Sequence, residues 1–195
     1  LNLLKEVQMN KPLILTTPKG TAKWPYLTEP DIEFNPDGLF HTKLSCKKSE
    51  SVNIKKAIDD MIAQEIKKQH DKDPNKAITK SLPYTEEGDD IIFNFKMNAK
   101  GVRKFDKKPF TQEPNLLNND LTPFDKSQRI WSDSILQITF EPYAWNMPVG
   151  IGCTLRIKTV KVVQLVTGKV ADTLGDLKAE PVVAPKVNQE AHNDY

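Results

Sequence analysis

The sequence predicts a small, mainly β domain in which five strands form a barrel and one helix is inserted between the early and late strands. Short segments with alternating apolar and polar residues recur along the chain, which is the pattern of half-buried strands. One segment has apolar residues at helical spacing instead. The 195 residues suffice for one sizeable core and a tail but are few for two full domains.

The strand pattern recurs in five segments. We expect strands at residues 11–17, 38–44, 90–98, 134–140 and 149–166. Between the first two, prolines recur from Pro18 to Pro36, and this punctuation predicts a loop. In the last segment, Gly150 and Gly152 permit close curvature near the start of the strand. Residues 99–130 are polar and carry a basic cluster, made up of Lys100, Arg103, Lys104, Lys107 and Lys108.

The predicted helix covers residues 51–70. Ile54, Ile58 and Ile62 lie on one face of it, with charged residues on the other. Ser49 or Ser51 can serve as the N-cap. We expect this helix to lie across the barrel or to cap its open end.

The outward residues of the predicted strands are cationic or polar. They are His41, Lys43, Lys96, Arg156 and Lys158. Tyr143 and Trp145 follow Pro142 at the end of a strand, which predicts two aromatic rings on the rim of a loop. Basic side chains along a groove, with rings on which bases stack, are typical of proteins that bind single-stranded nucleic acid. A tryptophan is more often buried than stacked on a base, so Trp145 remains open between a structural and a binding role.

Charge is divided unevenly along the chain. The total is +2, residues 172–195 carry −3, and the remainder therefore carries +5. A basic body with a mildly acidic tail fits an anionic partner for which the tail competes.

The sequence supports no class of enzyme. It has no glycine-rich phosphate loop, no serine nucleophile elbow and no HExxH zinc motif. The acid pairs at 59–60, 86–87 and 89–90 leave a two-metal nuclease as an alternative, although solvating charges explain them better. Cys46 and Cys153 lie far apart without metal-ligand spacing, so we expect reduced thiols, no metal and no cofactor. Apolar runs are short and the first residues lack a signal-peptide layout, so we expect neither a membrane span nor secretion.

Four blocks resemble, in order and spacing, the single-stranded DNA-binding proteins of podovirus-type (short-tailed) phages. They are Gly20–Ala22, Pro36–Phe40, Phe93–Lys96 and Tyr143–Gly150, the last within FEPYAWNMPVGIGCTLRIKTVKVVQLVTG at residues 140–168. The resemblance covers roughly residues 9 to 170. It implies an OB-fold, a five-stranded antiparallel barrel with one capping α-helix and a flexible C-terminal tail. The implied organisation is an N-terminal extension at 1–8, an OB domain at 9–171 and the mildly acidic tail at 172–195.

The resemblance also implies a function without catalysis. A protein of this family coats and protects single-stranded DNA in the host cell cytoplasm and assists phage replication, recombination and strand annealing. Its tail contacts the phage DNA polymerase and primase-helicase, and the family precedent is a homodimer. The stacking tyrosine of the family falls on Tyr143, and two basic positions fall on Lys96 and Lys11. The alternative is an OB-fold protein-interaction or virion module that binds no nucleic acid.

Overall fold

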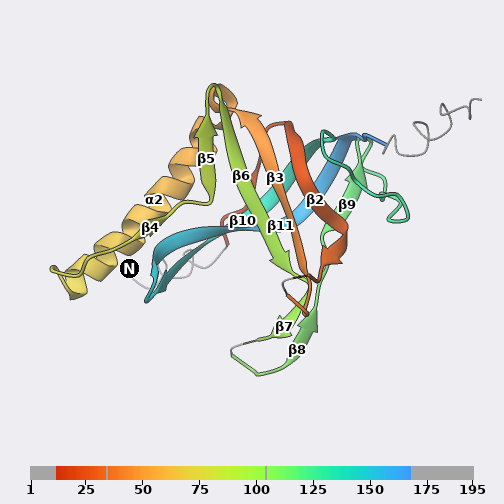
Figure 1. Ribbon diagram of the computed structural model, residues 1–195. Coiled ribbons are helices and arrows are strands. Elements are labelled where there is room, and N and C mark those ends of the chain that lie inside the picture. The colour runs from red at the N-terminus through yellow and green to blue at the C-terminus, as the bar shows by residue number, and fades with distance from the viewer. Residues whose placement is uncertain (1–11, 34, 104, 168–195) are drawn as a thin grey trace, which may run out of the picture.

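The computed structural model describes residues 12–33, 35–103 and 105–167. Twelve elements fall within these ranges, and Figure 1 shows the helix beside the strands of the barrel. In chain order they are β1 (Leu15–Thr16), β2 (Gly20–Asp31), β3 (Leu39–Lys47), α2 (Lys48–Lys72), β4 (Lys80–Ser81), β5 (Tyr84–Glu87), β6 (Asp90–Asn98), β7 (Lys100–Val102), β8 (Pro109–Thr111), β9 (Asn115–Asn118), β10 (Ile135–Met147) and β11 (Gly150–Gln164). The expected extension at 1–8, the basic position Lys11 and the tail at 172–195 lie outside the described residues.

Five strands form the body of the domain in the pairing order β2–β3–β6–β11–β10. β10 also pairs with β2, through Ile135 with Thr21 and Leu136 with Gly20. The mainly β, OB-like architecture with one helix in the described residues confirms the predicted fold class. The expectation of antiparallel pairing throughout is wrong in one place, because β6 and β11 run parallel. An odd number of strands in a cyclic order cannot alternate in direction throughout, so one parallel pair is unavoidable.

The proline-punctuated stretch is a strand for most of its length, and the predicted loop is wrong there. β2 pairs with β3 in three sections, and register shifts separate Lys23 from Tyr26 and Tyr26 from Asp31. Pro25 lies within the first shift and Pro30 within the second. Proline has no N–H to give to a ladder and is tolerated where the pairing is interrupted by a bulge. The prolines therefore bend this strand without ending it.

The core follows the predicted alternation. Its largest fully buried side chains include Phe93, Phe95, Phe140, Leu136, Ile138 and Ile151. Ile54, Ile58 and Ile62 of α2 complete the core, and α2 packs against β3, β6, β10 and β11. Removing this apolar surface from water stabilises the domain by roughly 25 cal/mol per Å². The helix thus holds the strands that carry the outward cations.

The start of the helix differs from the prediction. α2 follows β3 without a break, so Lys47 occupies the N-cap position and no side chain caps it. The backbone N–H of Lys48 donates to the carbonyl of Asp89 at 3.0 Å. Ser51 is buried in the helix and its Oγ has no hydrogen-bond partner in the described residues, so the predicted serine cap is wrong. The turn between β5 and β6 thus accepts one N–H of the first helical turn in its place.

The connection between β6 and β10 contains structure that the sequence did not predict. β7 and β8 form a separate two-stranded hairpin, which projects at the lower end of the barrel in Figure 1. β9 adds a parallel strand to β11. β1 and β4 are two-residue pairings on β10 and β11, so the predicted strand at 11–17 is reduced to Leu15–Thr16 within the described part of the chain.

Candidate nucleic-acid interface

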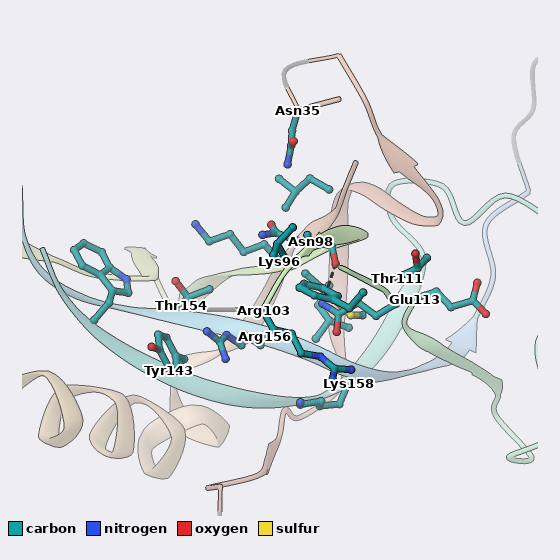
Figure 2. Close-up of a pocket in the computed structure, with 18 of the residues that line it drawn as sticks. Asn35, Lys96, Asn98, Arg103, Thr111, Glu113, Tyr143, Thr154, Arg156 and Lys158 are labelled. Atoms are coloured by element: carbon teal, nitrogen blue, oxygen red, sulfur yellow. Dashed lines mark hydrogen bonds between the residues drawn. The ribbon is translucent and has the colours of Figure 1, made fainter. Parts of the chain in front are cut away.

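A groove of about 1290 Å³ lies between β6, the β7–β8 hairpin and the hairpin made by β10 and β11. Figure 2 shows Lys96, Arg103, Tyr143 and Arg156 around it. Its charged and aromatic lining residues include Lys96, Arg103, Phe110, Tyr143, Trp145, Arg156 and Lys158. The structure thus brings five of the eight predicted binding residues into one groove: Lys96, Tyr143, Trp145, Arg156 and Lys158.

Strand geometry sets the positions of the cations. Leu155 and Ile157 of β11 are buried, which leaves Arg156 and Lys158 exposed on the outer face. Arg156 is the register partner of Lys96 across the parallel β6–β11 ladder. Neighbouring strands lie about 4.8 Å apart, so two positive charges share one level of the groove. The outward orientation predicted for these three cations is confirmed.

Tyr143 lies in a strand, so the prediction that it sits on a loop rim is wrong. β10 continues to Met147 and pairs with β11 as far as Gly150. The Tyr143 ring is 45% exposed, and the guanidinium carbon of Arg156 lies 3.6 Å from its centroid. Arg156 therefore covers part of the ring in a cation–π contact, and the rest of the ring stays open to the groove.

Trp145 also lies in β10 and has a structural contact as well as a place in the groove. Its register partner is Gly152, where a Cβ atom would lie 2.5 Å from Cζ2 of Trp145 and 2.7 Å from the carbonyl oxygen of Ser81. The indole therefore packs on a backbone that is free of a side chain. A glycine at position 152 is required for this approach.

Lys158 is partly neutralised. Its ammonium nitrogen lies 2.7 Å from the carboxylate of Glu141, which is 19% exposed. An ion pair near solvent is worth little stability, about 0–1 kcal/mol, so an incoming phosphate can compete for the lysine.

His41 and Lys43 do not line the groove. His41 is the β3 register partner of Lys96, and its Nε2 lies 3.2 Å from the carboxylate of Asp31. The backbone N–H of Glu33 and the His41 imidazole hold the pKa of Asp31 below its usual range. Lys43 places its ammonium 5.1 Å from the ring centroid of Trp24. These two residues therefore belong to the neighbouring surface over β2 and β3.

Sequence reasoning did not assign a binding role to several aromatics. Phe110 lines the groove from β8, a strand of three residues that is too short for a period to be seen. Trp24 and Tyr26 lie in β2, where the predicted loop concealed their orientation, and Arg129 and Trp131 lie beside them. The signal available in the sequence was the alternation of buried and outward residues in β2, which is interrupted by one extra residue at Trp24 and then resumes.

The acid pairs have structural partners. The hydroxyl of Tyr84 donates to Asp59 at 2.6 Å, and Lys55 donates to the same carboxylate at 3.0 Å. Burial raises the pKa of Asp59, but these two hydrogen bonds outweigh it and leave the pKa lowered. Asp60 pairs with Lys56 along the helix. Asp59 therefore ties α2 to β5, whereas Asp60 stays on the exposed face of the helix.

The remaining acids and the cysteines can be placed as well. Glu86 pairs with Lys48, and Asp90 pairs with Lys47. Cys46 and Cys153 are free thiols, and both are buried. Among the described residues, no three His, Cys, Asp or Glu side chains gather closely enough to hold a metal ion. The helix in this part of the chain is not apolar enough to cross a membrane.

Comparison with known proteins gives a match of structure only. No family model matches the chain, and no curated protein sequence matches it. The crystal structure of gp2.5, a single-stranded DNA-binding protein encoded by bacteriophage T7, superposes with a TM-score of 0.66 and 22% identity, covering 80% of this chain and 94% of that one. The single-stranded DNA-binding protein from bacteriophage Enc34, in complex with ssDNA, gives a TM-score of 0.52 and 12% identity, covering 77% and 86%. The truncated Enc34 protein gives 0.51 and 13%, covering 77% and 85%. The chain therefore has the fold of the single-stranded DNA-binding proteins of bacteriophages T7 and Enc34, which is the fold that its sequence blocks predict.

Proposed function

We propose that the chain binds single-stranded DNA without sequence preference in the groove between β6, β10 and β11. The observation that carries the proposal is the half-exposed ring of Tyr143, held beside Arg156 in a groove that also contains Lys96. A single strand offers exposed base faces and a charged backbone. The base faces can stack on an open aromatic ring, and the charged backbone can bind a row of cations.

The arrangement favours a single strand over a duplex. In a duplex the base faces are stacked inside the helix, so a ring in a groove has nothing to stack on. Stacking tolerates any base because every base has a π-face, and phosphate contacts carry no sequence information. The two phage proteins of the same fold are named for single-stranded DNA binding, and one was solved with single-stranded DNA.

The finer roles extend this proposal. The chain would coat single-stranded DNA in the host cell cytoplasm during phage replication, recombination and annealing, without catalysing a reaction. Residues 9–171 would form the DNA-binding domain, as a monomer or a homodimer. Residues 172–195, with a net charge of −3, would compete with DNA for the cations and bind the phage polymerase and primase-helicase.

A fluorescence titration with oligo-dT at several salt concentrations tests the proposal. For a single strand, the slope of log K against log salt is about −0.7 per phosphate contacted. Contacts from Lys96, Arg103 and Arg156 predict a slope of roughly −2. A duplex of the same length is the control and should bind more weakly. An affinity that ignores salt, or that is equal for duplex, would contradict the proposal. Absence of any affinity for the single strand would favour a protein-interaction module.

The tail is tested by deletion of residues 172–195. If the acidic segment competes with DNA, the truncated chain should bind oligo-dT more tightly, and the difference should shrink as salt rises. An unchanged affinity at low salt would remove the competing role of the tail.

A further inference from the structure

A second group of aromatic and cationic side chains lies outside the groove, over β2, β3 and the segment that precedes β10. We call it the outer array; its members are Trp24, Tyr26, Lys43, Arg129 and Trp131. Trp24 is 62% exposed and Trp131 is 37% exposed, so large parts of both indoles face solvent. Exposed tryptophans that gather in one patch are typical of a surface that binds a ligand or another macromolecule.

Cations and rings alternate through the outer array. The ammonium of Lys43 lies 5.1 Å from the centroid of Trp24. The guanidinium carbon of Arg129 lies 5.7 Å from the centroid of Tyr26 and 4.6 Å from that of Trp131. This is the same pairing of guanidinium and ring that Arg156 and Tyr143 make in the groove.

The backbone holds Trp24 outward at a conformational cost. Its φ is +48°, in the left-handed region that non-glycine residues rarely adopt. It lies at the register shift after Lys23, where two consecutive residues face outward before Pro25 returns to the core. The N–H of Trp24 donates to Oγ of Ser132 at 3.1 Å, which ties the bulge to the segment carrying Trp131. Strained residues of this kind cluster at functional surfaces.

The outer array is continuous with the groove. Arg156 pairs in register with Lys96, Lys96 with His41, and His41 with Tyr26, so one row crosses four neighbouring strands. The rings of His41 and Tyr26 are stacked, with centroids 4.9 Å apart. At about 4.8 Å per strand, the row from Arg156 to Tyr26 spans roughly 14 Å. The pairing of β6, β3 and β2 side by side can be followed in Figure 1.

We propose that the outer array is a second stacking segment on the path of the same single strand, which leaves the groove at Lys96 and crosses β3 and β2 to Trp24 and Trp131. The inference rests on the proposed function of the groove. Alternation of cations with open rings suits a chain that alternates phosphates and bases. Exposed Trp and Arg also suit a protein partner, but the continuous row from Arg156 and Lys96 of the groove through His41 to Tyr26, with Arg129 beside it, favours the polyanion.

The test compares oligo-dT of two lengths on the full chain. Site sizes of about 4–16 nucleotides per OB fold suggest lengths of roughly 6 and roughly 20. Trp24→Ala/Trp131→Ala should lose at least about tenfold in affinity for the long oligonucleotide, because stacking on a ring is removed, and less than about twofold for the short one. The occluded site size in saturating titrations should fall as well. Trp24→Phe/Trp131→Phe keeps a smaller aromatic ring at each position and should bind both lengths nearly as the unaltered chain does.

Control variants distinguish a failure of the second stacking segment from a failure of the proposed DNA binding in the groove. Val52→Ala, at an exposed position of α2, should change neither affinity. Circular dichroism and thermal unfolding establish that the alanine variant is folded. If it is not, Arg129→Gln, at an exposed position of the array, carries the comparison: it should weaken binding of the long oligonucleotide and not of the short one, and equal binding of the long one would overturn the second segment. Equal affinity of the alanine variant and the unaltered chain for the long oligonucleotide would overturn the second segment and leave the array to a protein partner. Failure of the unaltered chain to bind either length would overturn the proposed function itself.

Discussion

Replacing Tyr143 by alanine tests the groove most directly. The ring is 45% exposed and lies in a strand whose inward neighbours form the core, so its loss should leave the fold intact. The substitution removes a stacking surface and the ring beneath the Arg156 guanidinium in one step. We expect weaker binding to single-stranded DNA with little change in stability.

The magnitude follows from the contacts. Stacking of one base on an aromatic ring is worth about 1–3 kcal/mol, which corresponds to a loss of about fivefold to 150-fold in affinity. The cation–π contact with Arg156 adds about 0.5–1 kcal/mol at an exposed site, and its loss frees the guanidinium to choose other rotamers. A loss near the upper end would show that Tyr143 also positions Arg156. Tyr143→Phe keeps the ring and should bind within about twofold of the unaltered chain.

The assay is a titration of labelled oligo-dT at fixed salt, with urea unfolding of each variant. The salt slope should change little in Tyr143→Ala, because a ring contacts no phosphate. Unaltered affinity in a folded Tyr143→Ala chain would refute the stacking role. A loss that appears only alongside a loss of stability would refute it equally.

Three further outcomes are expected. Glu141→Gln should free Lys158 and raise affinity by about twofold to fivefold at low salt, equivalent to ~0.5–1 kcal/mol, with a steeper salt slope in the same titration. Asp59→Asn should lower the free energy of unfolding in urea by about 1–3 kcal/mol, because the buried Tyr84 loses its charged acceptor, whereas Asp60→Asn on the exposed face should cost less than about 0.5 kcal/mol. Burial raises the pKa of the two cysteine thiols to about 12 and about 11, so both should resist alkylation at pH 8 in the folded chain. The pKa of each thiol is higher in the folded than in the unfolded chain, so above pH 9 the thiols ionise in the unfolded chain first and the free energy of unfolding should fall as the pH rises. A cysteine-free variant should show a smaller fall.

Strand periodicity predicted the elements of this fold that have an uninterrupted pattern. The strand predicted at residues 90–98 is found as β6 with the same ends, and the helix predicted at 51–70 is three residues longer at its start and two at its end. Both segments bury one continuous face, so local sequence and tertiary packing agree. Apart from β2, the elements that were missed are short: β4, β5, β7, β8 and β9 have two to four residues each. Strands this short form only because another strand pairs with them, and the residues of the short strand alone do not predict that partner strand.

The groove was predictable by residue type but not by shape. The outward cations of β6 and β11 follow from alternation alone, whereas their nearness follows from a parallel pairing between strands 60 residues apart in sequence, as Lys96 and Arg156 are. The pairing of Lys158 with Glu141 was missed for a related reason, since it joins neighbouring strands of a hairpin whose register is shifted. The residue types therefore predict which side chains could bind DNA, whereas the long-range strand register determines which of them lie together in the groove.

Register shifts link the groove and the outer array to one feature of the sequence. In β11 the buried side chains are odd-numbered up to Ile157 and even-numbered from Val160, with the buried Gly152 as the exception. In β2 the buried positions change from even to odd between Ala22 and Pro25. A change of phase means that two consecutive residues face outward, which is what a β-bulge produces. The β11 shift keeps Phe140 opposite Ile157 in the core, where unbroken pairing would set it opposite Lys158. It thereby places Tyr143 opposite Thr154 and one diagonal step from Arg156, within the reach of a long side chain. A slip in alternation is visible in the sequence without any structure, and in this chain both slips turn cationic or aromatic residues outward at the surfaces proposed to bind DNA.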